Sequence, residues 1–283
     1  HRRRARSVTM ATAPRLKTPA RKPKTSGKDG PSGPSFFASG FTFPRVIGHR
    51  GAARHAPENT LAGLRMAASM GVACVEFDVR LTKDGVPVLF HDGTVERTTD
   101  GRGRLGTLTL AQVRRLDAGT WFAPRFAGER VPTLVEAIET LAECGLAANI
   151  ELKPEEARGA ATARAVLAAL GENWPRARPR PLLSSFDWSA LATLAAEDAG
   201  WPRGLLIRDP RQPQWRAWAV RIGAAAIHCG ARGLDRAGFE TLKAAGLPIA
   251  IYTVNDVRRA RSLWHWGAAA IFTDDPPRLL AVR

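Results

Sequence analysis

The segment RVIGHRG at residues 45–51 is a short apolar run that ends in polar residues, and three later segments repeat this arrangement. They are VACVEFD (residues 72–78), VPVLFHD (residues 86–92) and AANIELK (residues 147–153). Each apolar run has the length of a buried β-strand. We therefore expect four strands whose polar ends converge at one mouth of a parallel sheet.

The polar residues at these strand ends are those that a site for an anionic substrate needs. Residues two apart on a strand point to the same face, so Glu76 and Asp78 face together, as do Glu151 and Lys153. The full set comprises Glu76, Asp78, Glu151, His49, His91, Arg50 and Lys153. Carboxylates bind hard divalent cations, and such a cation can assist chemistry on an anionic substrate. The pattern predicts a metal-assisted site.

Apolar runs alternate with segments of helical period along most of the chain, which is typical of βα units and a parallel sheet. The predicted strands span residues 45–48, 73–78, 147–151, 182–185, 204–207, 225–228, 248–253 and 269–273. No Gly-x-Gly-x-x-Gly follows the first strand, which disfavours a doubly wound open sheet. We expect an α/β protein folded as a closed (β/α)8 TIM barrel, with a small insertion after the second strand.

Helices are predicted between the strands, and residues of capping type mark many of their ends. The predicted helices span residues 59–70, 110–116, 134–144, 157–170, 188–197, 236–245 and 257–266. The glycines that suit a left-handed position after a helix are Gly71, Gly145, Gly171, Gly200, Gly246 and Gly267. Thr133 and Asn255 suit helix N-termini.

Residues 92–131 interrupt this alternation with a stretch rich in Thr, Gly and Arg. An ordinary βα loop has about two to six residues, so this segment is an insertion on the functional face of the barrel. Trp121, Phe122 and Phe126 would give it an apolar wall for an alcohol group.

The chain has 283 residues and a net charge of +16, with 42 Lys and Arg against 26 Asp and Glu. Residues 1–40 are basic, rich in Pro, Ser and Gly, and nearly devoid of large apolar side chains, which predicts a disordered tail. Residues 41–283 have the size of a (β/α)8 barrel. Clustered positive charge attracts phosphates. A solvated tail is nevertheless the simpler interpretation, and a nucleic-acid partner is not expected.

The cysteines and the hydropathy of the chain indicate its cellular compartment. Cys74, Cys144 and Cys229 lie in apolar runs without paired spacing, as expected of reduced core residues in a cytosolic protein. No run approaches the about 18 to 20 apolar residues of a membrane span, and the basic N-terminus is not followed by a secretory cleavage pattern. We expect a cytoplasmic protein without stable membrane insertion, whose oligomeric state the sequence leaves open.

In the order and spacing of its motifs, the chain resembles the glycerophosphodiester phosphodiesterase family of the bacterial cytosolic type from about residue 45 to the C-terminus. These motifs are His49-Arg50-Gly51, Pro57-Glu58-Asn59-Thr60, Glu76-x-Asp78, Thr82-Lys83-Asp84-Gly85, His91-Asp92, Glu151-x-Lys153, Ser184-Ser185-Phe186, Thr253-Val254-Asn255 and Thr273-Asp274-x-Pro276. The resemblance implies a TIM barrel that hydrolyses glycerophosphodiesters to sn-glycerol 3-phosphate and an alcohol, with Mg²⁺ or Ca²⁺ as cofactor. It places the enzyme in lipid and glycerol metabolism.

The two histidines would be the acid and the base of this reaction, because imidazole titrates near neutral pH. The residues alone do not say which of His49 and His91 is the acid. The resemblance makes His91 the acid that protonates the leaving group, and His49 the base or the partner of the nucleophile.

The remaining site residues would bind the metal, the phosphate and the glycerol. Glu76, Asp78 and Glu151 would be the metal ligands, and Arg50 and Lys153 would neutralise the phosphate. Glu58 would lie beside the metal ligands or serve as a helix start with Asn59 as cap, and Phe186 would line the site. Tyr252 stands where the family usually has tryptophan. It would still provide an aromatic wall for the glycerol, but the change leaves the details of substrate recognition open. His55 and His228 are expected on loops or the rim. His265, on a predicted helix between Trp264 and Trp266, is expected to be structural or exposed.

The sequence leaves two other functions open. One is a lysophospholipase D-like phosphodiesterase of the same superfamily, which requires a lipid-sized apolar groove. The other is a phosphate- or nucleic-acid-binding barrel without catalysis. This second function is disfavoured because a degenerate binder is expected to lose at least one of the central polar positions.

Overall fold

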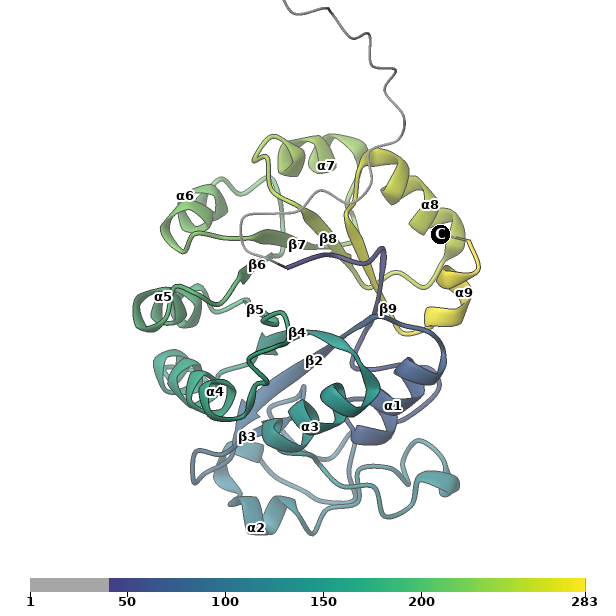
Figure 1. The fold of residues 1–283 in the computed structure, drawn as a ribbon, viewed down its shortest axis with the longest axis vertical. Coiled ribbons are helices and arrows are strands. Elements are labelled where there is room, and N and C mark those ends of the chain that lie inside the picture. Colours follow the sequence, from purple (N-terminus) through teal and green to yellow (C-terminus); the bar gives the residue numbers. More distant parts are fainter. Residues whose placement is uncertain (1–40, 283) are drawn as a thin grey trace, which may run out of the picture. The chain divides into compact units, whose positions relative to one another are not determined.

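Eight parallel strands close into a barrel in the computed structural model of the chain, which describes residues 41–282 (Figure 1). The barrel strands are β1 (Val46–Gly48), β2 (Cys74–Leu81), β4 (Ala147–Leu152), β5 (Leu182–Ser185), β6 (Arg203–Ile207), β7 (Ala226–Gly230), β8 (Ile249–Tyr252) and β9 (Ala270–Thr273). Strand β1 closes the ring by pairing with both β2 and β9. The predicted (β/α)8 barrel is confirmed. The tail predicted at residues 1–40 lies outside the described residues.

One strand runs against the direction expected from the sequence. Strand β3 (Pro87–Leu89) pairs antiparallel with the last residues of β2, Val79 to Leu81. Strand β2 continues three residues beyond Asp78, and a tight turn then reverses the chain. In that turn Thr82 donates a hydrogen bond to Asp84 (2.6 Å), and Gly85 has a φ of +81°. The expectation that residues 86–90 end as a parallel strand of the sheet is therefore wrong.

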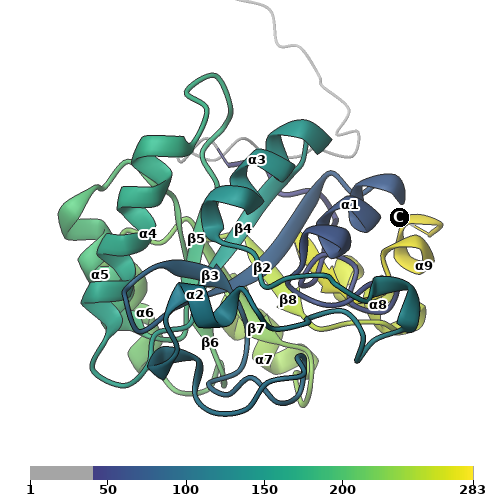
Figure 2. The same ribbon diagram turned by 90° about the horizontal axis from the view of Figure 1, so that it is seen from below.

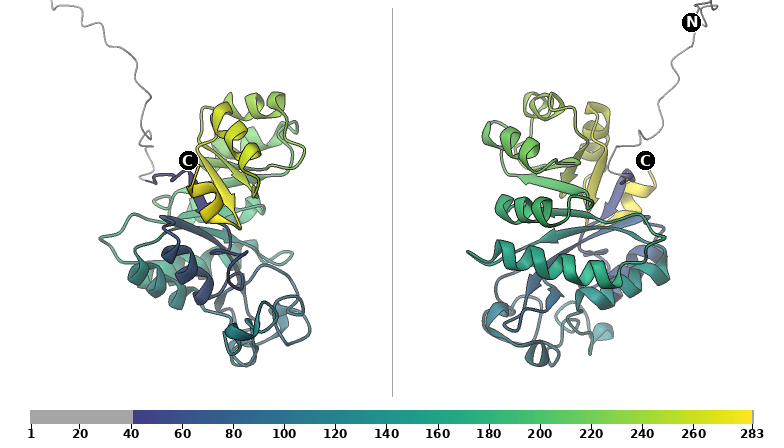
Figure 3. Two further views of the ribbon diagram at one scale, coloured as in Figure 1. Left: turned by 90° about the vertical axis from the view of Figure 1, so that its right-hand side faces the viewer. Right: turned by 60° about the vertical axis from the view of Figure 1, so that its left-hand side comes forward.

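Helices surround the barrel on its outside, and Figures 1 and 3 show α4 and α5 side by side there. They are α1 (Leu61–Ser69), α3 (Leu134–Cys144), α4 (Gly159–Asn173), α5 (Trp188–Glu197), α6 (Gln214–Arg221), α7 (Arg236–Lys243), α8 (Val257–Trp266) and α9 (Pro276–Leu280). The predicted bounds of α3, α5 and α8 are confirmed. The sequence did not predict α6, whose N-terminus follows two prolines, or α9, which begins with two.

The capping predictions are partly confirmed. Thr133 and Glu136 form a reciprocal capping box at the start of α3. Gly71, Gly145, Gly246 and Gly267 have the expected positive φ. Gly171 instead lies within α4, which continues to Asn173, and Gly200 is not left-handed. Asp256 rather than Asn255 caps α8, and Thr60 rather than Asn59 caps α1.

The segment at residues 92–131 folds beside β2 and β3 (Figure 2). It carries the 3₁₀ turns η1 (Leu105–Thr107) and η2 (Pro124–Phe126) and the short helix α2 (Leu110–Val113), which is shorter than predicted. Its apolar cluster comprises Val88, Phe90, Val95, Leu105, Val113, Ala118 and Val131. This cluster gives the long segment a core of its own.

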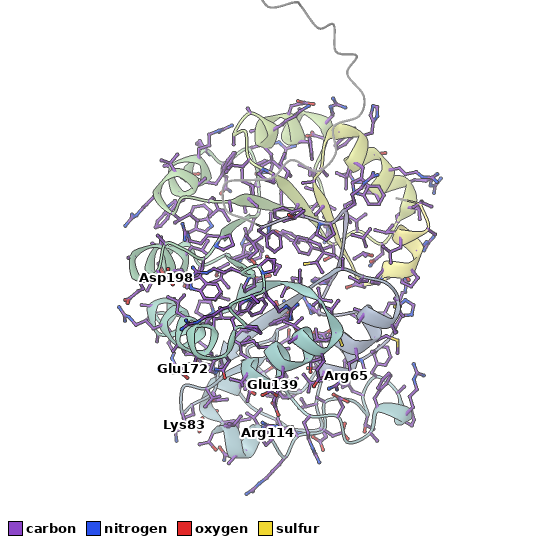
Figure 4. The ribbon with its side chains drawn as sticks, in the orientation of Figure 1. Arg65, Lys83, Arg114, Glu139, Glu172 and Asp198 are labelled. Carbon is purple, nitrogen blue, oxygen red and sulfur yellow. The ribbon has the colours of Figure 1, made fainter. Side chains whose placement is uncertain are left out.

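Apolar side chains fill two layers of the barrel domain. The larger layer lies between the strands and the helices, and exposed residues such as Arg65, Glu139 and Glu172 belong to the helices outside it (Figure 4). The smaller layer lies inside the barrel and comprises Phe41, Phe43, Ile47, Cys74, Leu182, Ala226, Ala250, Ala270 and Phe272. Within residues 41–282, no helix is long and apolar enough to cross a membrane.

Candidate active site

Three buried carboxylates meet near the carboxyl ends of two neighbouring barrel strands. Glu76 and Asp78 lie on β2 and Glu151 lies on β4, where Asp78 and Glu151 are register partners. One oxygen of each carboxylate lies within 4.8 Å of the others. The period-two geometry of β2 explains why its two carboxylates share the inner face.

The electrostatics of this cluster favour a bound cation. Burial raises the pKa of Glu76 well above its usual range, and the charges of Asp78 and Glu151 raise it further. Burial and Asp78 also raise the pKa of Glu151, to about 7. Burial would raise the pKa of Asp78 too, but Lys153 and Arg50 outweigh it. Among the described residues, Oε1 of Glu76 has no hydrogen-bond partner. The donor set therefore fits a divalent metal ion.

Asp78 is fixed by Asn59, a residue whose place before the first helix predicts a helix cap instead. The Asn59 side-chain amide donates to Oδ2 of Asp78 (2.9 Å), and the Asp78 backbone N–H donates to Oδ1 of Asn59 (3.0 Å). Asn59 has a φ of +56°, a conformation that asparagine tolerates better than most residues. Its place directly after Glu58 in a motif was the available signal for this role.

Two cations contact the carboxylates. The Arg50 backbone N–H donates to Oε2 of Glu76 (3.0 Å), and its Nε lies 3.4 Å from Oδ2 of Asp78. The Nζ atom of Lys153 lies 2.6 Å from Oε1 of Glu151 and 3.4 Å from Oδ1 of Asp78. Arg50 and Lys153 are each only 17% exposed and line the same cavity, so both can face a phosphate bound there.

Glu58 contacts arginines rather than the carboxylate cluster. Its Oε1 accepts from Nη1 of Arg50 (2.7 Å), and both its oxygens accept from Arg97 (2.7 and 2.9 Å). Arg97 also donates to both oxygens of Asp92. The sequence did not predict Arg97, which joins Glu58 to the residue after His91. No spacing signal marks it, since its partners meet only in the fold.

Both predicted histidines face one cavity, and a carboxylate holds Nδ1 of each. In His49 this atom lies 2.6 Å from Oδ1 of Asp274, and Nε2 lies 3.9 Å from Oε2 of Glu76. In His91 it lies 2.5 Å from Oδ1 of Asp92. A carboxylate on Nδ1 fixes the ring and its tautomer, which leaves Nε2 for chemistry.

The carboxylate that holds His49 is itself held in place. Asn255 donates to Oδ2 of Asp274 (2.7 Å), and its Oδ1 accepts from the Asp274 backbone N–H and from Thr273 (both 2.8 Å). The sequence interpretation assigned Asn255 to a helix start and gave Asp274 no role. Their motif positions were the only signal.

The cavity has a volume of about 150 Å³ and lies inside the mouth of the barrel. Phe186 and Tyr252 wall it edge to face, with ring centroids 5.9 Å apart. The Tyr252 hydroxyl donates to the Ile207 carbonyl (3.0 Å), which fixes this ring. The expected aromatic wall is therefore present, and the glycerol that it would contact stays a prediction.

His228 lies in the interior of the barrel, so its predicted place on the rim is wrong. It is 1% exposed and lines the inner end of the cavity. The sequence placed the end of this strand at residue 228, whereas β7 continues to Gly230 and leaves His228 in its middle. His55 does lie near the surface, where its Nε2 is 2.9 Å from Oδ1 of Asp275. His265 is exposed, as expected.

A second, more open groove of about 470 Å³ adjoins the cavity at His49 and Arg50. Trp121 and Phe122 from the segment at residues 92–131 line it and contact each other edge to face at 5.7 Å. Two of the three aromatic residues predicted for that wall therefore border the site, whereas Phe126 packs edge to face against Phe122 at 5.6 Å and does not line the groove. The alcohol group that the wall would face stays a prediction.

Comparisons with known proteins point to one family. The chain matches the model of the glycerophosphoryl diester phosphodiesterase family over residues 49–278. It is 33% identical over 235 residues to a glycerophosphodiester phosphodiesterase of Caldanaerobacter subterraneus subsp. tengcongensis, covering 83% of this chain and 96% of that one. The mouse glycerophosphodiester phosphodiesterase 1 is 55% identical over 95 residues, 33% of this chain and 29% of that protein.

A solved structure matches the fold as well. It is an Oleispira antarctica phosphodiesterase in complex with the product sn-glycerol-3-phosphate. The TM-score is 0.81 at 37% identity, and the match covers 84% of this chain and 96% of the other.

Proposed function

Because the chain belongs to the glycerophosphoryl diester phosphodiesterase family and is a hydrolase of glycerophosphodiesters, we propose how it acts on them. The three buried carboxylates hold a divalent cation, Mg²⁺ or Ca²⁺, and two histidines transfer protons. The products are sn-glycerol 3-phosphate and an alcohol.

The observation that carries this proposal is that His49 and His91 line one cavity, each with Nδ1 on a carboxylate. Acid–base cleavage of a phosphodiester needs one group that takes a proton from the attacking oxygen and one that gives a proton to the departing oxygen. Two imidazoles with free Nε2 atoms can divide these tasks. We assign the base to His49 and the acid to His91.

The cations around the cavity bind the phosphate in this proposal. Arg50 presents a planar guanidinium that pairs with two oxygens, and Lys153 supplies a compact charge that stabilises the pentavalent transition state. A divalent cation, when bound, neutralises the carboxylates and polarises the phosphate. Glu58 keeps Arg50 in place through the hydrogen bond to Oε1.

Of the two alternative functions, one is set aside and the other depends on the substrate site. Catalysis is shared by the named relatives, which sets aside a barrel that only binds phosphate or nucleic acid. Whether the enzyme also has a lysophospholipase D-like activity depends on where the glycerol part of the substrate binds and on whether an acyl chain fits beside it.

The test of the assignment compares two substrates with different leaving groups. Replacing either histidine by alanine should lower kcat on glycerophosphocholine by about 10²- to 10⁴-fold. On an aryl phosphodiester that releases p-nitrophenolate, His91→Ala should be partly spared, because this leaving group departs without protonation. His49→Ala should not be spared.

The exposed His265 provides a matched control, since His265→Ala should leave both rates unchanged. Equal losses of both active-site variants on both substrates would overturn the assigned roles. No loss at all would remove the histidines from the reaction.

A further inference from the structure

Arg97 lies at the centre of a chain of hydrogen bonds that begins and ends at residues of the active site. Its Nε and Nη2 donate to Oδ2 and Oδ1 of Asp92 (2.5 and 3.1 Å), and its Nη1 and Nη2 donate to Oε2 and Oε1 of Glu58 (2.9 and 2.7 Å). All three guanidinium nitrogens are therefore engaged. A carboxylate that is held by both of its oxygens is fixed in direction as well as in distance.

The two oxygens that Nη2 of Arg97 contacts are those that hold residues of the site. Oδ1 of Asp92 lies 2.5 Å from Nδ1 of His91, and Oε1 of Glu58 accepts from Nη1 of Arg50 at 2.7 Å. One nitrogen atom therefore joins the carboxylate that holds a proposed proton donor to the carboxylate that holds a proposed phosphate ligand. Removing it would release both carboxylates together.

The charge of Arg97 also acts on both carboxylates. Its hydrogen bonds hold the pKa of Asp92 well below the usual range, so Asp92 stays ionised as the acceptor for His91. Burial would raise the pKa of Glu58, but Arg97 and Arg50 outweigh it. Because the two arginines share Oε1 of Glu58, Arg97 limits how strongly this carboxylate attracts Arg50. Arg50 thus keeps part of its charge for a phosphate.

Buried neighbours hold the backbone at Arg97 in place. Val95, two residues before it, belongs to the apolar cluster of the segment at residues 92–131, and Thr98 and Thr99 directly after it are buried. The Thr99 hydroxyl donates to the Val95 carbonyl (2.7 Å) across the turn that contains Arg97. The side chain therefore reaches Asp92 and Glu58 from a fixed base.

Stability alone gives little reason for this arrangement. Arg97 is 46% exposed and Asp92 is 27% exposed, and ion pairs at such positions contribute little to the free energy of unfolding because water screens them. Four directed hydrogen bonds do provide orientation. The residues that they orient are His91 and Arg50, which both line the 150 Å³ cavity.

We propose that Arg97 is a positioning residue for the reaction, which sets the ring of His91 through Asp92 and the guanidinium of Arg50 through Glu58. This inference rests on the proposed function, because it takes His91 as the acid and Arg50 as a phosphate ligand. Arg97 acts through other residues, since the two carboxylates occupy its three nitrogens. The segment at residues 92–131 thus contributes to the reaction through its first turn.

The first experiment compares two substrates of Arg97→Gln. We expect kcat on glycerophosphocholine to fall at least about 10-fold, the usual effect of removing a group that orients a site residue. On an aryl diester that releases p-nitrophenolate, kcat should fall by less than about threefold, because this leaving group departs without a proton. Arg102→Gln, the same change at an exposed position of the same segment, should alter neither rate. Equal losses of kcat on both substrates would overturn the proposal, and so would no loss.

The second experiment separates the charge of Arg97 from its shape. Arg97→Gln should raise KM at least about threefold on both substrates, because Glu58 then attracts Arg50 more strongly and draws it away from the phosphate. Arg97→Lys keeps the charge and should bring KM back to within about twofold. It should leave kcat on glycerophosphocholine low, since an ammonium lacks the planar fork that aligns Asp92. Full recovery of kcat in Arg97→Lys would show that a positive charge is enough, and the positioning role would be refuted.

An NMR measurement tests the same point without relying on rates. The Nδ1 proton that His91 shares with Asp92 should give a downfield signal, identified by its absence from His91→Ala. We expect Arg97→Gln to lose this signal and to keep the corresponding signal of His49, which Asp274 holds. An unchanged His91 signal would overturn the proposal. Full activity of His91→Ala would instead refute the acid role, and loss of the His91 signal in Arg97→Gln would still establish that Arg97 orients this ring.

Discussion

At the scale of the residue, Asp274 shows how one carboxylate can decide what a histidine does. It accepts from His49 at 2.6 Å, while its neighbour Asp275 makes the corresponding contact with His55 at 2.9 Å, outside the cavity. The two carboxylates are adjacent in the chain and have similar partners, and only the first serves a histidine that lines the site. The motif Thr273-Asp274-x-Pro276 marks Asp274, but only the fold shows which histidine each carboxylate meets.

This pair gives a prediction with an internal control. Asp274→Asn should lower kcat by roughly 100-fold with little change in KM, because the amide no longer fixes the tautomer that leaves Nε2 of His49 free. Asp275→Asn should change kcat by less than about twofold. Steady-state kinetics on glycerophosphocholine measure both. Similar losses in the two variants would show that Asp274 only supports the local fold.

A second prediction at this scale concerns the metal. Glu76, Asp78 and Glu151 repel one another in a buried site, so activity should be lost with EDTA and return with a divalent cation. Glu151→Gln should weaken metal binding by about 10-fold or more without unfolding the barrel. Titration calorimetry with Mg²⁺ and Ca²⁺ on metal-stripped protein measures this. Full activity of stripped protein in excess EDTA would contradict it.

At the scale of the element, two helices begin with the same capping box but differ in how much of the core packs against them. Thr133 and Glu136 cap α3, whose Leu134, Ile138 and Leu141 are buried in the main core. Thr109 and Gln112 form the same box at α2, a four-residue helix on the surface segment. The same capping chemistry therefore stabilises one helix that belongs to the main core and one that can open locally.

Replacing the cap residue in each helix should reveal this difference. Thr133→Ala should lower the free energy of unfolding by about 1 to 2 kcal/mol, the usual cost of losing a threonine cap. Thr109→Ala should cost less than about 0.5 kcal/mol in the global transition, since α2 can open locally. Urea denaturation followed by circular dichroism measures both. Equal costs would mean that α2 unfolds only together with the barrel.

Strand β2 is the element that organises the site. It carries Glu76 and Asp78 on its inner face and then continues into the antiparallel pairing with β3 that delivers His91. Two site residues and the path to a third therefore depend on one strand. The sequence shows the alternation of this strand, and the short turn at residues 82–85 was an available signal for the reversal after it, because a parallel continuation needs a crossover of about a dozen residues or more.

At the scale of the whole molecule, two aromatic residues that precede the first strand belong to the barrel. Phe41 and Phe43 contact each other edge to face at 4.9 Å and are 3% and 8% exposed. They pack with Ile47, Cys74 and Leu182 in the apolar layer inside the barrel. The barrel domain therefore needs residues before β1, and residue 41 sets where a truncation should stop.

This packing predicts two different outcomes for two nearby changes. Deleting residues 1–40 should leave kcat/KM on glycerophosphocholine within about twofold, as the composition of that segment suggests. Replacing Phe41 and Phe43 together by alanine should lower the free energy of unfolding by at least about 3 kcal/mol, because it empties part of a buried layer. Kinetics and chemical denaturation test the two. Loss of activity on deleting residues 1–40 would show that this segment contributes to the barrel or the site.

The sequence by itself determined the barrel and the residues that its strand ends bring to the mouth of the barrel. Alternating apolar runs and helical segments predict parallel βα units. The period of two along each strand then predicts that Glu76, Asp78 and Glu151, which lie near strand ends, point into the barrel. The order of the short motifs indicated the family. These motifs are local too, because each lies next to a strand that the apolar runs predict.

The tertiary structure alone decided which residues position the others and which lie in the interior. Asp274 meets His49 across 225 positions of the chain, Arg97 joins Glu58 to Asp92, and His228 turns inward to the cavity. Such contacts depend on the closure of the ring between β1 and β9 and on the true length of β7. A local period carries no information about either, because it fixes the face of a residue on its own strand but not the partner that the closed barrel brings to it.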